Sequence, residues 1–190
     1  INREWFDIPK DYCYGIYINV LRECKKRFSI EIVSFVLMDN HFHMIVKSPK
    51  ISISVFLRYF MTETARGIRV KSDRINQVYG SRNYKTLIND PRYLAHCLKY
   101  IARNPVAAGI SDKVETYKWS SFSNQASLMN DLAHINMQDK LYSSLPKSRE
   151  DLLAWLNSPL PKELEKQSQR ALKKSIFEFG TVRSLSLIHI

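Results

Sequence analysis

Hydrophobic and polar positions alternate with two different periods along the chain, and each change of period marks a predicted element. Residues Ile30 to Met38 form an apolar, β-branched and aromatic run, which is typical of a buried strand. Asp39 and Asn40 are turn residues, and His41 to Lys47 resumes as a second strand, so the two runs are predicted to form a hairpin. A helix is predicted before them, from about Pro9 to Phe28, with Asp7 as its cap.

The middle of the chain predicts two more helices and a short strand. One helix covers Ser54 to about Val70, and the strand covers Asn83 to Ile88 after a polar loop. The clearest helix follows, because Asp90 can cap it and Pro91 suits its first position. Pro105 is expected to end this helix at or before Asn104.

Beyond about residue 125 the segments are short, polar and helical in tendency. Arg149 to Leu156 and Leu164 to Phe177 are the best candidates for helices. The pattern predicts no element for residues 184–190. We therefore expect one catalytic domain over residues 1–124 and a helical or partly disordered extension over residues 125–190.

Composition narrows the class of protein. The chain has 190 residues, of which 45% are hydrophobic, as expected for one globular domain or for one domain with a small appendage. Cys13, Cys24 and Cys97 are far apart and form no CxxC pair, which favours reduced thiols over a zinc array or a disulfide framework. No apolar run is long enough to span a bilayer and no signal peptide is recognised, so we expect a cytoplasmic protein without a membrane partner.

The net charge points to a polyanionic partner. Lys and Arg number 29 against 18 Asp and Glu, which leaves a formal charge of +11. Such an excess favours nucleic acid, because neutralised phosphates release condensed counterions. Charge alone leaves open a merely soluble basic protein or one that touches acidic lipid.

The first candidate for chemistry is the pair His41 and His43. Side chains alternate between the faces of a strand, so both imidazoles are predicted to point the same way while Phe42 faces the opposite side. Two histidines in this arrangement can share a metal ion. Strand histidines are more often surface or hydrogen-bonded residues, so the pair alone leaves both readings open.

The second candidate lies on the helix that begins at Asp90. Tyr100 and Asn104 are four residues apart and therefore share one face, at the margin of the apolar stripe. A tyrosine hydroxyl needs help to act as a nucleophile at neutral pH, and a neighbouring oxygen that binds a cation would supply it. Tyr93 is a poorer candidate, because its partner four residues on is Cys97, which suits a hard cation badly. An aromatic residue that simply packs at the helix edge is the alternative.

Three segments together resemble the motifs of single-tyrosine transposases. The stretch from Phe35 to His43 resembles their histidine–hydrophobe–histidine (HUH) metal motif, and Tyr100 to Gly109 resembles their tyrosine helix and its exit. Tyr117 to Ser121 is similar to the motif that follows. Among these transposases the chain is most similar to the REP-associated tyrosine transposases, over about Asn2 to Phe122.

The resemblance implies a fold and a set of roles. The fold is α+β, the ferredoxin-like HUH palm: an antiparallel sheet that carries the histidines, with helices packed on it. His41, His43 and Asn104 would bind a divalent cation, Mg²⁺ or Mn²⁺, and Tyr100 would be the nucleophile. The match starts after the family's first strand, so the sheet is expected to lack that strand if residues have been lost upstream.

The implied activity is the cutting and rejoining of single-stranded, hairpin-forming DNA through a 5′-phosphotyrosine link, by a monomer or a homodimer. Basic and aromatic residues are the candidates for contacts with that DNA. They are Arg58, Arg66, Arg69, Lys71, Arg74, Arg82, Tyr84 and Lys85, with Tyr79 as a further aromatic among them.

Two other functions remain open at this point. A non-catalytic nucleic-acid-binding protein derived from such a transposase would bind DNA without cutting it. A metal-dependent hydrolase that activates water at His41 and His43 would cut DNA and leave no protein–DNA adduct.

Overall fold

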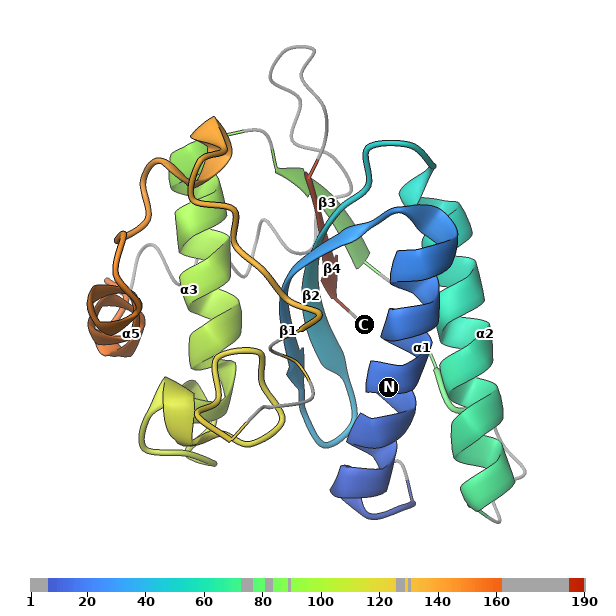
Figure 1. Ribbon diagram of the computed structural model, residues 1–190. Helices are drawn as coiled ribbons and strands as arrows, with labels where there is room; N and C mark the ends of the chain where they lie inside the picture. Colours follow the sequence, from blue (N-terminus) through green and yellow to red (C-terminus); the bar gives the residue numbers. More distant parts are fainter. Residues whose placement is uncertain are drawn as a thin grey trace.

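The protein consists of a central sheet with helices on both faces (Figure 1). The computed structural model describes residues 7–72, 77–80, 84–88, 90–125, 129, 131–161 and 185–189, with residues 84 and 185–189 described as backbone. Its helices are α1 (Lys10–Phe28), α2 (Ile53–Lys71), α3 (Pro91–Ala107) and α5 (Arg149–Asn157), with short 3₁₀ turns η1 (Val114–Thr116) and η2 (Lys140–Tyr142). Its strands are β1 (Glu31–Leu37), β2 (Phe42–Lys47), β3 (Tyr84–Ile88) and β4 (Leu185–His189). The predicted α+β class, with helices packed on an antiparallel sheet, is confirmed.

The strand order of the sheet is β1-β2-β4-β3, and every neighbouring pair is antiparallel. The β1–β2 hairpin is the one predicted, with Leu37 opposite Phe42 and Val36 opposite His43. The strand that was not predicted is β4, which pairs with β2 on one side and β3 on the other. Residues 185–189 therefore form an interior strand of the sheet, between β2 and β3.

Both faces of the sheet are covered, which explains why β1 and β2 are buried along almost their whole length. On one face, Phe35, Phe42 and Met44 pack against α1 and α2. On the other face, Val36 and Ile45 pack with the apolar stripe of α3. The alternation of side chains along β2 thus sends consecutive residues into two separate cores.

Two helix ends differ from the prediction. Pro9, not Asp7, is the N-cap residue of α1, and no side-chain hydrogen bond caps that end. The helix α3 begins as predicted, since the Asp90 carboxylate accepts hydrogen bonds from the backbone N–H groups of Arg92 and Tyr93. It does not stop at Asn104 but continues through Pro105 to Ala107.

The physical reason for the longer α3 lies just beyond it. Pro105 removes one backbone donor, which is a tolerable loss in the last turn of a helix. The chain leaves the helix at Gly109, whose φ of +70° is a conformation that favours glycine. The N–H groups of Gly109 and Ile110 donate to the carbonyls of Val106 and Pro105, closing the end.

The segment Tyr117 to Ser121 runs along the free edge of β1. The N–H of Leu37 donates to the Trp119 carbonyl at 2.9 Å, and the N–H of Ser121 donates to the Phe35 carbonyl at 2.8 Å. The Tyr117 hydroxyl also donates to the Leu37 carbonyl at 2.7 Å. This motif covers the edge of the sheet beside the turn that leads to His41.

Residues beyond 125 pack on this framework. Met129 and Leu132 join the core beneath α1, while Leu152 and Leu156 of α5 join the core around α3. An ion pair ties the same region to β2, because the Lys47 ammonium lies 2.8 Å from a carboxylate oxygen of Asp139. The contact lowers the pKa of Asp139 and raises that of Lys47.

We expect Asp139→Asn to destabilise the protein by about 1 kcal/mol at pH 7, since the ion pair is mostly shielded and the substitution keeps an oxygen that caps η2. A carboxylate with a lowered pKa contributes stability above about pH 4, and this contribution is lost as the pH falls through its folded-state pKa. Urea unfolding should show a smaller difference between Asp139→Asn and the unmodified protein at pH 3 than at pH 7. The exposed Asp131→Asn is the control, and an equal effect from both variants would contradict the role of the pair.

Candidate active site

The two histidines of the HUH motif lie side by side on the α3 face of the sheet. Their Nε2 atoms are 3.2 Å apart, and the rings are nearly perpendicular with centroids 4.9 Å apart. His43 is fully buried in β2, and His41 is half-buried just before that strand. Phe42 between them points to the other face, where its ring contacts those of Tyr17 and Phe60. The predicted alternation is confirmed.

Asn40 holds the ring of His41. Its side-chain oxygen lies 2.7 Å from Nδ1 of the imidazole. When Nδ1 carries the proton and donates it to this oxygen, Nε2 keeps a lone pair directed toward His43. The turn residue before the motif therefore selects the tautomer that a metal ligand needs.

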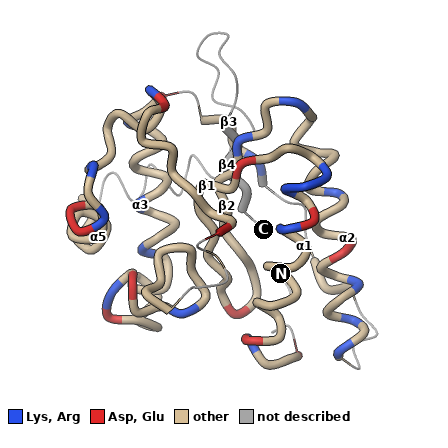
Figure 2. The backbone as a smooth tube through the Cα atoms, viewed as in Figure 1, with Lys and Arg blue, Asp and Glu red and all other residues tan. Residues whose placement is uncertain are grey.

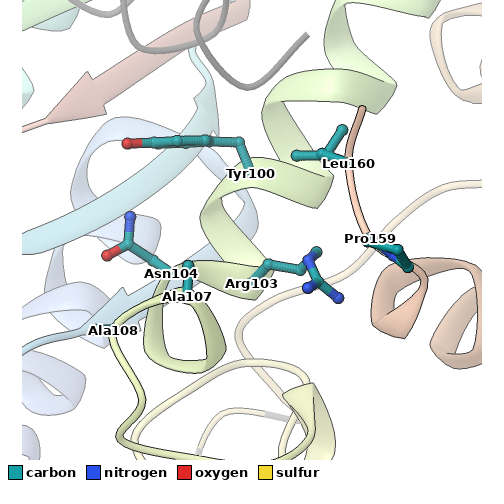
Figure 3. Close-up of a pocket in the computed structure, with 7 residues that line it drawn as sticks. All are labelled: Tyr100, Arg103, Asn104, Ala107, Ala108, Pro159 and Leu160. Carbon is teal, nitrogen blue, oxygen red and sulfur yellow. The ribbon is translucent and has the colours of Figure 1, made fainter. Parts of the chain in front are cut away.

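Tyr100 reaches the histidines from α3. Its ring centroid lies 6.3 Å from that of His43, with the two planes nearly perpendicular. Asn104 stands one turn further along α3, and Figure 3 shows its amide on the same side of the helix as the Tyr100 hydroxyl. One chain thus brings the phenol, two imidazoles and an amide to the same region between α3 and β2.

The histidine pair fits a divalent ion. Two nitrogens that each lie about 2.1 Å from one ion, at an angle near 100°, would be about 3.2 Å apart, which is the observed Nε2 separation. Within the described residues no three or more His, Cys, Asp or Glu side chains form a metal-binding group. Among these residues, the amide oxygen of Asn104 is a candidate for a further donor of another type.

Comparison with known proteins assigns the chain to a family. Residues 8–104 match the family model described as "Transposase IS200 like", and this range includes His41, His43, Tyr100 and Asn104. The chain belongs to the IS200-like transposase family. A curated relative from Haemophilus influenzae, provisionally named a REP-associated tyrosine transposase, is 26% identical over 121 residues, which cover 56% of this chain and 69% of the relative. No solved structure matches significantly.

The charged residues proposed as DNA contacts in this IS200-like transposase lie apart from Tyr100. Arg58, Arg66, Arg69 and Lys71 are exposed on α2, on the opposite side of the sheet (Figures 1 and 2). Nη2 of Arg66 forms an ion pair with a carboxylate oxygen of Glu63, at 2.5 Å. They form a basic helix surface, and the structure does not bring them to the tyrosine.

The structure describes only some of the other residues proposed to contact DNA. Lys85 lies on β3 and donates to the Ser54 hydroxyl at 2.7 Å, next to the start of α2. Arg74 and Arg82 lie outside the described residues, and Tyr84 is described as backbone. No helix in the described part of the transposase is long and apolar enough to cross a membrane.

Tyr79 is held by contacts with the core of the protein. Its hydroxyl is hydrogen-bonded to those of Tyr17 at 2.7 Å and Thr64 at 2.6 Å, and its ring packs on Phe42. Burial raises its pKa well above the ordinary range. The side chain is partly buried against the core beneath α1 and α2, and a base-stacking role for this residue stays a prediction.

Sequence reasoning missed the residues that surround Tyr100 on its other side. A pocket of about 530 Å³ is lined by Tyr100, Arg103, Asn104, Ala107, Ala108, Pro159 and Leu160. Arg103 is three residues after Tyr100, a spacing that places it near the tyrosine on the helix surface. Pro159 and Leu160 follow α5, and no local pattern in the sequence connects them to α3.

We expect Asn40→Ala to weaken the binding of Mn²⁺ about tenfold, because loss of the hydrogen bond frees the tautomer and rotation of His41. His41→Ala should weaken it at least as much. Isothermal titration calorimetry with MnCl₂ measures both effects. The exposed residues Asn19 and His134 provide matched alanine controls, and equal affinity in Asn40→Ala and Asn19→Ala would argue against the positioning role.

Proposed function

We propose that this protein cleaves and rejoins single-stranded, hairpin-forming DNA, with Tyr100 as the nucleophile and a divalent ion held by His41, His43 and Asn104. The observation that carries the proposal is the 6.3 Å approach of the Tyr100 and His43 rings within one chain. Membership of the IS200-like transposase family supports the same reading. Because one chain supplies the phenol and both imidazoles, the reaction would not require a partner subunit to complete the site.

The proposed step is a phosphoryl transfer to tyrosine. The Tyr100 oxygen attacks phosphorus and forms a P–O bond, while the bond from phosphorus to the 3′ oxygen of the preceding nucleotide breaks. The phenol gives up its proton, and the departing 3′ oxygen takes one up to become a hydroxyl. The 5′-phosphotyrosine retains the energy of the cleaved bond, so a later attack by a 3′ hydroxyl rejoins DNA without ATP.

Two imidazoles and an amide oxygen suit a cation that accepts mixed nitrogen and oxygen ligands, and we propose Mg²⁺ or Mn²⁺. When bound, such an ion would offset the negative charge that develops on the phosphate oxygens. His41 is oriented for this role by Asn40, and His43 is fixed by its position inside β2. Tyr100 is oriented by the packing of α3, since Leu98 and Ile101 on the same helix are fully buried.

Binding of the DNA itself would draw on the positive charge of the chain, which is +11 in total. Exposed cations on α2 would contact phosphates away from the cleavage point, so the strand would pass around more than one face of the sheet. We propose that the protein acts in the cytoplasm, where the reducing environment keeps thiols such as its three buried free cysteines reduced.

Tyr100→Phe should abolish the covalent adduct between protein and DNA, because the ring keeps its packing but loses the attacking oxygen. The assay mixes the protein with a labelled hairpin DNA and Mn²⁺ and detects the adduct on a denaturing gel. Tyr93→Phe is the matched control, since Tyr93 lies two turns earlier on α3 and should still form the adduct.

Each other result identifies a different function. Persistence of the adduct in Tyr100→Phe would refute the assignment of the nucleophile. Cut DNA without any adduct in the unmodified protein would indicate a hydrolase that activates water. Tight DNA binding without cleavage would indicate the non-catalytic nucleic-acid-binding alternative.

A further inference from the structure

The pocket beside Tyr100 has two unlike walls. Figure 3 shows Tyr100 and Asn104 on one side of α3, and Arg103 reaching the other way toward Pro159. The small side chains of Ala107 and Ala108 line the pocket at the end of the helix, and Leu160 adds an apolar surface. An aromatic ring and apolar groups next to a guanidinium and an amide match the chemistry of one nucleotide, which has a flat base and an anionic phosphate.

Arg103 is held in place by the end of α5. Its Nη1 donates to the backbone carbonyls of Leu156, at 3.4 Å, and Asn157. A guanidinium has five N–H donors, so this anchoring leaves further donors for a ligand. Among the described residues no carboxylate forms an ion pair with Arg103. Its charge is therefore available to an anion, and its fixed position reduces the entropy lost on binding.

Lys99 stabilises the same wall. Its ammonium donates to the Ser158 hydroxyl at 2.6 Å and lies 4.8 Å from the centroid of the Trp155 ring. The segment that carries Pro159 and Leu160 is thus attached to α3 by two cations, Lys99 and Arg103. The pocket is preformed on both sides and has a volume of about 530 Å³, within the usual range of ligand sites.

The geometry points to this pocket as the binding subsite for a single nucleotide next to the cleaved bond, with Arg103 contacting its phosphate. This inference rests on the proposed function, because that function supplies the scissile phosphate at Tyr100. Tyr100 and Asn104 line this pocket and also belong to the proposed active site. Arg103 would act as a positioning residue, holding the strand so that the neighbouring phosphate faces the tyrosine.

Binding can be measured without cleavage in a Tyr100→Phe background, with EDTA present and a fluorescein-labelled, mixed-sequence single-stranded DNA as the probe. Adding Arg103→Gln should weaken binding about fivefold and reduce the slope of log affinity against log salt by about 0.7, the value for one lost phosphate contact. Arg103→Lys should restore the slope, because the charge returns. Arg92→Gln removes the same charge from an exposed position on α3 and is the control.

A second variant separates the pocket from the anchoring of α5. Ala107→Phe fills the pocket from an exposed position and leaves the hydrogen bonds of Arg103 intact. It should weaken binding by a similar factor with an unchanged salt slope, whereas Asn19→Phe at an exposed position on α1 should have no effect. Thermal unfolding checks that each variant is folded. Unchanged affinity in Ala107→Phe, or an unchanged salt slope in Arg103→Gln, would overturn the subsite.

The covalent assay distinguishes failure of the subsite from failure of the proposed function. If the unmodified protein forms the adduct but Ala107→Phe and Arg103→Gln bind DNA normally, the subsite is wrong and the function stands. If both variants lose binding but no adduct ever forms, the pocket takes a nucleotide in a protein that does not cleave DNA.

Discussion

The packing of α3 on the sheet determines the candidate site, since every other feature of the site depends on where that helix lies. Its apolar stripe is buried against Val36 and Ile45, and this packing fixes the position of the helix on the sheet and its rotation about its own axis. Tyr100 lies at the margin of that stripe, half-buried, and its ring is nearly perpendicular to that of His43, with centroids 6.3 Å apart. The same burial holds His43, so the phenol and the imidazole are positioned by one continuous core. Precise placement of this kind is what a phosphoryl transfer needs, because small displacements of the reacting groups are costly.

The local parts of the fold and of the site could be predicted from the sequence. The period of two from His41 to His43 was enough to place the imidazoles together, and the Asp90-Pro91 pair marked the start of α3. The spacing of Tyr100 and Asn104 placed both on one helix face. These predictions succeeded because each depends on the geometry of a single element. The chemical roles of these residues remain predictions.

The parts that could not be predicted depend on contacts between distant segments. Nothing in the sequence near Pro159 or Leu160 indicates that they face Arg103, since that contact requires α5 to dock on α3. Tyr79 looked like a surface aromatic among cations, yet three-dimensional packing directs its hydroxyl to Tyr17 and Thr64. Pro105 suggested an early helix end, but Gly109, with its positive φ, sets the end instead. In each case tertiary structure overrode a local preference.

The position of β4 in the middle of the sheet affects how the molecule must assemble. The residues that it joins are separated by well over a hundred positions from β2, so this pairing closes a very large loop. Sheets built from such distant segments fold slowly, and until the last strand arrives β2 and β3 expose unsatisfied backbone edges. Those edges are templates for any extended chain nearby, including another copy of the same protein. A chain in which β4 has not yet paired is therefore more exposed to aggregation and strand exchange than the finished molecule.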